Sequence, residues 1–157
     1  MKRRFGYTIL ELMITLSIVA VLVGFGISAY ASARDRQVGQ SAAETILDLL
    51  KNDQQDAIVG KKDCNDTFLG IEVKTTANTS TMTSQSLCQG NVGTKTTTTI
   101  TGITFTNSLD ITFLPLSGGI DLGGGTLSTV NFTSAIALKY AISVNSTGVM
   151  RYLGIQP

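Results

Sequence analysis

The sequence predicts an α+β chain, in which one long N-terminal α-helix precedes a C-terminal antiparallel β-rich head of two sheets. One observation behind this prediction is a run of 22 consecutive uncharged residues from Leu12 to Ala33. Another is that apolar residues recur at helical spacing between residues 43 and 58. After Gly60 the composition changes sharply, and Thr, Ser, Gly, Asn and β-branched residues dominate.

The uncharged run is long enough to cross a hydrocarbon core of about 30 Å as an α-helix. Lys2, Arg3 and Arg4 precede it, and the mixed Arg-Asp-Arg sequence of residues 34–36 follows it. Because basic residues favour the cytoplasmic side of a membrane, this asymmetry places the N-terminus in the cytoplasm. The sequence therefore predicts a single membrane pass with the head outside the cytoplasm.

Beyond the uncharged run the pattern is amphipathic, and residues 34–60 are expected to pack one apolar stripe on the head. The stripe consists of Ala43, Ile46, Leu47, Leu50, Ala57 and Ile58. Gly60 is a natural C-cap, so the helix is expected to run from Tyr7 to Val59, about 80 Å at 1.5 Å per residue. Three glycines inside it suit local melting during filament packing, close helix contact or simple tolerance: Gly24, Gly26 and Gly39.

Residues 61–157 are expected to form the head. Six segments of alternating or β-rich character predict its strands: Phe68–Lys74, Thr94–Phe105, Leu109–Leu114, Thr126–Phe132, Ile136–Val144 and Val149–Leu153. In the fifth segment, alternate residues from Ile136 to Val144 are expected to face the core. Asn145–Gly148 has the composition of a hairpin turn. Two sheets packed on the helix stripe are the expected arrangement.

The two cysteines, Cys64 and Cys88, lie in the part of the chain expected outside the cytoplasm, where a disulfide persists. Closing a loop of this size stabilises a fold by about 3 kcal/mol in the chain-entropy account. The alternative is a pair of buried free thiols. The polar segment Thr75–Gly93, which carries Cys88, is expected to be a surface excursion tied back to Cys64.

The composition argues against catalysis. The chain has no histidine and its cysteines and carboxylates are scattered, which excludes histidine-dependent acid–base chemistry, Ser-His-Asp arrangements and zinc sites of the usual ligand spacing. Gly123–Gly125 lacks the Lys-Ser/Thr of a phosphate-binding loop. No catalytic residue, metal or cofactor is expected, and the alternative of a membrane-anchored enzyme has no residue to support it.

The basic start and apolar run of the N-terminus suit two general kinds of targeting segment. A secretory signal peptide would end at a small-residue site such as Ala29-Tyr30-Ala31 or Ala31-Ser32-Ala33, but the apolar run is too long for that class. A plain signal anchor would account for the run and its basic flank. An ionised side chain at the centre of a bilayer costs about 2.5–3.5 kcal/mol, so Glu11 is a functional residue by default. The alternative is that Glu11 has no such role and lies at the level of the headgroups, where water screens its charge.

The third interpretation is more specific. The sequence Lys-Arg-Arg-Phe-Gly, then Tyr-Thr-Ile-Leu-Glu-Leu, then a long apolar helix resembles the class III signal of type IV pilins and type II secretion pseudopilins. Tyr7 replaces the more usual Phe at the first mature position, and Ile-Leu stands where Leu-Ile is commoner; both changes keep size and polarity. The resemblance implies that residues 1–6 are a leader, which a prepilin peptidase cuts off after Gly6 before it methylates Tyr7.

The same resemblance gives roles to the rest of the helix. Residues 7–33 are the transmembrane half that later becomes the filament core, and Glu11 is the family's fifth-position glutamate. Its expected partner is the Tyr7 amine of a neighbouring subunit. The implied partners are the prepilin peptidase, other pilin or pseudopilin subunits and an inner-membrane assembly platform. The implied location is the bacterial inner membrane, with the head in the periplasm or outside, and then the pilus or pseudopilus.

Three further segments resemble the GspH/FimT-type pseudopilins and minor pilins: residues 44–64, 111–128 and 140–153. This resemblance implies a low-abundance subunit at a filament tip or initiation complex, with a major pilin as the alternative. In some FimT-like members a basic Gly-Arg-x-Arg run binds DNA, whereas Gly148-Val149-Met150-Arg151 keeps only the glycine and the last arginine. Arg151 and Lys139 are therefore the candidate DNA-binding residues, and because they neutralise few phosphates, nucleic acid is a disfavoured partner.

Overall fold

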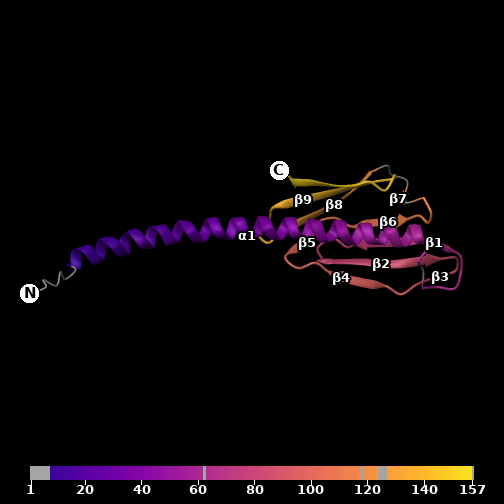
Figure 1. Cartoon of the computed structure of the whole chain (residues 1–157), viewed down its shortest axis with the longest axis horizontal. Helices are drawn as coiled ribbons and strands as arrows, with labels where there is room; N and C mark the ends of the chain where they lie inside the picture. The colour runs from indigo at the N-terminus through magenta and orange to yellow at the C-terminus, as the bar shows by residue number, and fades with distance from the viewer. Residues whose placement is uncertain (1–7, 62, 118, 124–126, 157) are drawn as a thin grey trace, which may run out of the picture. The chain divides into compact units, whose positions relative to one another are not determined.

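The computed structural model describes residues 8–61, 63–117, 119–123 and 127–156. One helix, α1 (Ile9–Val59, 51 residues), precedes ten strands (Figure 1). The chain divides into two units, residues 1–34 and residues 35–157, and the second unit contains the C-terminal half of α1 and all the strands. The predicted α+β fold class, a long N-terminal helix followed by antiparallel sheets, is confirmed.

Both ends of α1 have caps that the local sequence explains. Thr8 precedes the helix, and its Oγ1 accepts a hydrogen bond of 3.2 Å from the backbone N–H of Glu11, so the two residues take the positions of a capping box. At the other end Gly60 has a φ of 73°. The Gly60 N–H donates to Ala57 O and the Lys61 N–H to Asp56 O, which is the Schellman arrangement that glycine favours.

The strands form two antiparallel sheets. Their bounds are β1 (Phe68–Thr75), β2 (Thr81–Cys88), β3 (Asn91–Val92), β4 (Thr96–Thr99), β5 (Ile103–Phe105), β6 (Leu109–Phe113), β7 (Ile120–Asp121), β8 (Leu127–Ser134), β9 (Lys139–Asn145) and β10 (Met150–Gln156). The first sheet has the order β3-β2-β1-β6-β7, with β4 also paired to β2, and the second has the order β10-β9-β8-β5. Within the head, the C-terminal half of α1 lies across both sheets (Figure 1).

One apolar core joins this half of α1 to the inner faces of both sheets. From the helix come Ala42, Ala43, Ile46, Leu50 and Ala57; from the strands come Val73, Phe105, Ile111, Phe113, Val130, Phe132, Tyr140, Ile142 and Val144, among others. Most of the predicted stripe is therefore buried, although Leu47 is half-buried and Ile58 is exposed. The alternation predicted for Leu109–Leu114 is found, because Leu109, Ile111 and Phe113 are all buried.

The prediction of a surface excursion over Thr75–Gly93 is wrong, because this segment contains β2 and β3. The β2 strand pairs with β1 over most of its length and with β4 over Thr81–Ser84. Only Met82 and Cys88 of β2 are buried. The apolar pattern of β2 is weak because its other residues line a polar groove or the outer face of the sheet.

The single strand predicted over Thr94–Phe105 is also wrong, since β4 and β5 belong to different sheets. The chain turns between them at Gly102, which has a φ of 82°. A β-carbon at this glycine would lie 2.6 Å from Cγ1 of Val38 on α1. The glycine thus permits both the left-handed backbone and the close approach to the helix.

Two hairpin loops of the second sheet have the same hydrogen bonds. In the predicted turn Asn145–Gly148, the Gly148 N–H donates to Asn145 O, and Gly148 has a φ of 86°. In the β8–β9 loop the Ala137 N–H donates to Ser134 O, and Ala137 has a φ of 64°. Because β9 begins only at Lys139, the expectation that Ile136 starts a core-facing alternation is wrong, and its side chain is exposed.

Candidate functional site

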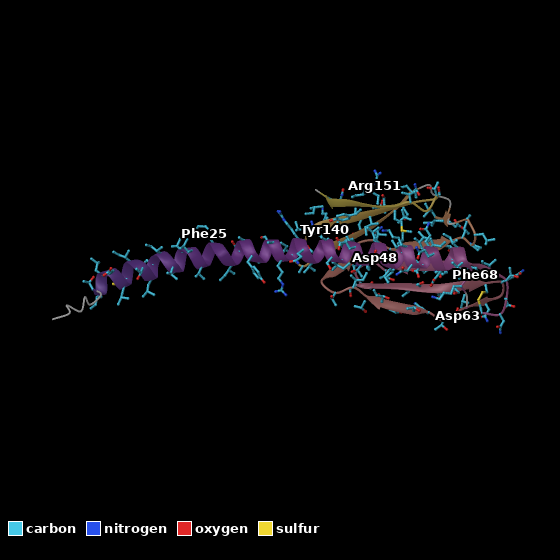
Figure 2. All side chains as sticks on the ribbon, in the orientation of Figure 1. Phe25, Asp48, Asp63, Phe68, Tyr140 and Arg151 are labelled. Atoms are coloured by element: carbon cyan, nitrogen blue, oxygen red, sulfur yellow. A yellow bond between two sulfur atoms is a disulfide. The ribbon has the colours of Figure 1, made fainter. Side chains whose placement is uncertain are left out.

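The N-terminal half of α1 is apolar around its whole circumference. Every residue from Thr8 to Arg34 is exposed within the chain. Among the described residues, α1 is the one helix that is long and apolar enough to cross a membrane. Figure 2 shows its side chains, Phe25 among them, pointing away from the helix axis on all sides. A helix that is apolar all round needs lipid or other helices around it.

Glu11 is the one charged residue from Thr8 to Ala33. It lies in the first turn of α1, where the positive end of the helix dipole stabilises a carboxylate. Thr8 accepts the backbone N–H of Glu11, so the predicted assembly residue also takes part in the cap that starts the helix. The predicted processing residues, Gly6 and Tyr7, lie outside the described residues.

The structure joins Cys64 and Cys88 in a disulfide, with 6.6 Å between their Cα atoms. Cys64 lies in the loop that follows α1, and Cys88 is the last residue of β2. The bond therefore ties the start of the head to the end of a strand whose few buried side chains give it little apolar anchoring. Both cysteines are thus in the arrangement that the sequence predicts.

A polar groove of about 350 Å³ lies between α1 and the β2–β4 side of the first sheet. Its charged and hydroxyl residues are Asp53, Asp56, Lys61, Asp63, Ser84, Ser86, Thr94, Thr96 and Thr98. This groove was not predicted from the sequence. A signal was present in the serines and threonines of β2 and β4, which occupy inward positions where a core strand would have apolar residues.

The carboxylates of the groove have different surroundings. Burial raises the pKa of Asp53, and a hydrogen bond of 2.9 Å from Ser84 Oγ offsets part of this rise. Asp63 accepts a 2.6 Å hydrogen bond from the Thr94 N–H, which holds its pKa below the ordinary value. Asp56 forms an ion pair of 2.7 Å with Lys61 and raises the pKa of that lysine. Each carboxylate therefore has a partner within the head.

Where the head begins on α1, two contacts hold the helix to the second sheet. Ser134 Oγ donates a hydrogen bond to the Asp35 carboxylate, and both residues are buried. One turn further along, the Tyr140 ring lies so close to Gly39 that a β-carbon there would be 2.2 Å from Tyr140 Cζ. Burial raises the pKa of the Tyr140 phenol. The sequence analysis identified neither contact, because residues about 100 positions apart form them.

The two candidate DNA-binding residues do not come together. Arg151 of β10 is paired with Ser143 of β9, and Lys139 is the first residue of β9. Positions 139 and 143 are separated by about 13 Å at 3.3 Å per residue. Both side chains are exposed. Two cations at this spacing do not form the dense basic patch that binding along a nucleic-acid backbone requires.

The described part of the chain contains no group of three His, Cys, Asp or Glu residues that could hold a metal ion. Comparison with known proteins gives one match: residues 1–27 fit the family model of the prokaryotic N-terminal methylation motif. No curated protein and no solved structure matches the chain. The motif supports a type IV pilin-like protein with a prepilin-type N-terminus, anchored in a membrane by its apolar helix.

Proposed function

We propose that this protein is a minor pilin or pseudopilin, a structural subunit of a type IV pilus or of a type II secretion pseudopilus. The observation that carries the proposal is the fit of residues 1–27 to the N-terminal methylation motif. The wholly exposed apolar half of α1, which needs lipid or other helices around it, supports the same function.

The precursor inserts into the bacterial inner membrane with its three leading basic residues in the cytoplasm and its head on the opposite side. A prepilin peptidase removes residues 1–6 and methylates the new N-terminus at Tyr7. The cap at Thr8 and Glu11 begins only two residues after the cleavage point. The mature helix therefore keeps its capped first turn after the leader is removed.

Assembly then exchanges lipid for protein around the apolar half of α1. Subunits leave the bilayer at an assembly platform and pack their helices together in the filament core, where the same apolar surface contacts other subunits. Glu11 meets the Tyr7 amine of a neighbouring subunit. An unpaired charge away from water is costly, so the helices are held in the register that brings the two charges together. In that register each charge neutralises the other.

The resemblance of residues 44–64, 111–128 and 140–153 to the GspH/FimT type supports a minor subunit. A major pilin is the alternative, since a two-sheet, disulfide-linked head suits either. No observation favours a FimT-like role in DNA uptake, because Arg151 and Lys139 do not form a dense basic patch. The abundance of the subunit in sheared filaments distinguishes a minor from a major pilin.

Intact-mass analysis of protein extracted from membranes tests the proposal. The expected species begins at Tyr7 and carries one methyl group. A chain that begins after Ala31 or Ala33 would identify a secretory signal peptide, and a chain that keeps residues 1–6 would identify a plain anchor. The Gly6→Leu variant is the control, because it blocks the peptidase while leaving the membrane-spanning run unchanged.

A further inference from the structure

The hairpin loop between β8 and β9, residues 135–138, presents apolar side chains to the solvent. Ala135, Ile136 and Ala137 are exposed, Ile136 to 51%, and Leu138 is half-buried. Ala137 has a left-handed backbone, which a β-carbon disfavours, although the equivalent position of the β9–β10 hairpin is a glycine. Backbone strain retained in an exposed apolar loop points to a functional constraint on it.

The loop is bonded to α1 at a residue that closely follows the membrane-spanning run in the sequence. Ser134, the residue before the loop, donates its hydrogen bond to Asp35. Asp35 follows Ala33, the last residue of the uncharged run, by two positions, or about 3 Å along a helix axis. The headgroup layer is roughly 6 Å thick on each side of the hydrocarbon core. Two positions of chain therefore cannot carry Asp35 beyond the headgroup layer when the run spans the bilayer, and the loop is bonded to Asp35.

Two basic residues adjoin the loop and its hydrogen-bond partner in the sequence. Arg36 follows Asp35 and is exposed, and Lys139 follows the loop directly and is exposed as well. The adjacent acid, Asp35, is buried and bonded to Ser134. An apolar tip with basic neighbours is typical of segments that lie in the interface of anionic membranes.

We propose that residues 135–138, together with Arg36 and Lys139, dock on the anionic lipid headgroups of the membrane that α1 spans. Ile136 enters the boundary between headgroups and acyl chains, and the two basic side chains contact lipid phosphates. The contact holds the head against the membrane until the subunit is extracted into a filament. This inference rests on the membrane anchoring in the proposed function and adds a second, reversible membrane contact to it.

A neighbouring subunit is the other occupant that this loop could have. Lipid is favoured for two reasons that the chain itself supplies. The loop is bonded to a residue two positions from the membrane span, and its charged flank complements anionic phosphates. The test must therefore examine the anchored protein before assembly.

The chain contains no tryptophan, so a single introduced tryptophan reports only its own surroundings. Full-length Ile136→Trp is reconstituted into vesicles of phosphatidylglycerol and phosphatidylcholine, with and without brominated acyl chains. Val149→Trp is the matched control, because Val149 is an exposed apolar residue (58%) of the β9–β10 hairpin, which has the same turn. Flotation of the vesicles first establishes that both variants are anchored, and an intact Cys64–Cys88 bond establishes that both heads have formed.

The emission of Ile136→Trp is expected to move to shorter wavelength and to lose intensity with brominated lipid, whereas that of Val149→Trp does neither. At low salt, adding Arg36→Gln or Lys139→Gln lowers the ratio of inserted to free loop about fivefold each. Equal spectra for the two anchored variants would overturn the inference and leave the proposed function intact. Shielding of Ile136→Trp only in assembled filaments would also overturn it and assign the loop to a subunit interface. Failure of both variants to float would remove the anchoring on which both proposals depend.

Discussion

The two halves of α1 share one helical backbone and differ in what surrounds their side chains. From Ile9 to Arg34 every residue is exposed, although most are apolar. From Asp35 to Val59 the apolar residues form a stripe, and the stripe is buried in the head. The difference shows that the helical backbone forms whether or not the rest of the chain covers its side chains. The second half has its apolar partner within the chain, whereas the first half must find one outside it.

The largest expected effect comes from removing a carboxylate from each half of α1 in turn. Glu11→Ala is expected to insert and be processed but to enter filaments at least about tenfold less than the parent, because removing one partner of a buried pair costs about 3–5 kcal/mol. Glu44→Ala is the control, since it removes an exposed acid from the amphipathic half. Quantitative immunoblots of sheared filaments and membranes make the measurement. Normal incorporation of Glu11→Ala would end the proposed role of that residue in assembly.

Truncating one leucine to alanine in each half compares the two halves by their contribution to stability. Leu50→Ala is expected to lower the free energy of unfolding of the head by about 2–5 kcal/mol, because Leu50 is fully buried and its loss leaves a cavity. Leu22→Ala, at a position that is 64% exposed, is expected to leave head unfolding unchanged. Denaturant titration of the full chain in detergent, followed by near-ultraviolet circular dichroism, measures both. Equal losses in the two variants would mean that the halves do not unfold independently.

Glycine substitutions are expected to have a large effect in one half only. Gly39→Ala places a methyl group against the buried Tyr140 ring, which stacks on Phe132 at 5.3 Å and has little room to move. The expected loss is about 1–3 kcal/mol in the free energy of unfolding. Gly26→Ala meets nothing within 4 Å in the chain, and its head should unfold as the parent does. Thermal melts of the two variants in the same detergent compare them directly.

The sequence predicted the parts of the fold that depend on local pattern. The uncharged run, the amphipathic stripe, the cap at Gly60 and the turn at Asn145–Gly148 each depend on residues within a few positions of one another. All four are found in the structure. The pattern at residues 1–27 is equally local, which is why the prepilin-type N-terminus was evident without a structure.

The features that the sequence did not predict depend on residues far apart in the chain. Thr81–Cys88 forms a strand because β1 and β4 pair with it on its two edges, although its own apolar alternation is weak. The break between β4 and β5 occurs at Gly102, whose close approach to Val38 of the helix joins residues 64 positions apart. The hydrogen bond between Ser134 and Asp35 could not be predicted, because the two residues are 99 positions apart and local spacing does not indicate such a contact.

The smallest effect concerns pH and a carboxylate of the amphipathic half. Burial raises the pKa of Asp53 above its ordinary value of 3.8, so the folded head binds this proton more tightly than the unfolded chain does. Ionised Asp53 therefore lowers stability above the folded pKa, and this penalty disappears as the pH falls towards 3.8. Asp53→Asn keeps an acceptor for Ser84 and removes the charge. It should be slightly more stable than the parent at pH 7, and the gap should close near pH 4.

Thermal melts of full-length protein between pH 7 and pH 4 measure this gap. Asp48→Asn is the matched control, because Asp48 is an exposed acid of the same half. It should shift the melting temperature by a similar amount at both pH values. A gap for Asp53→Asn that widens as the pH falls would mean that the Ser84 hydrogen bond outweighs burial, so that the ionised form of Asp53 stabilises the groove.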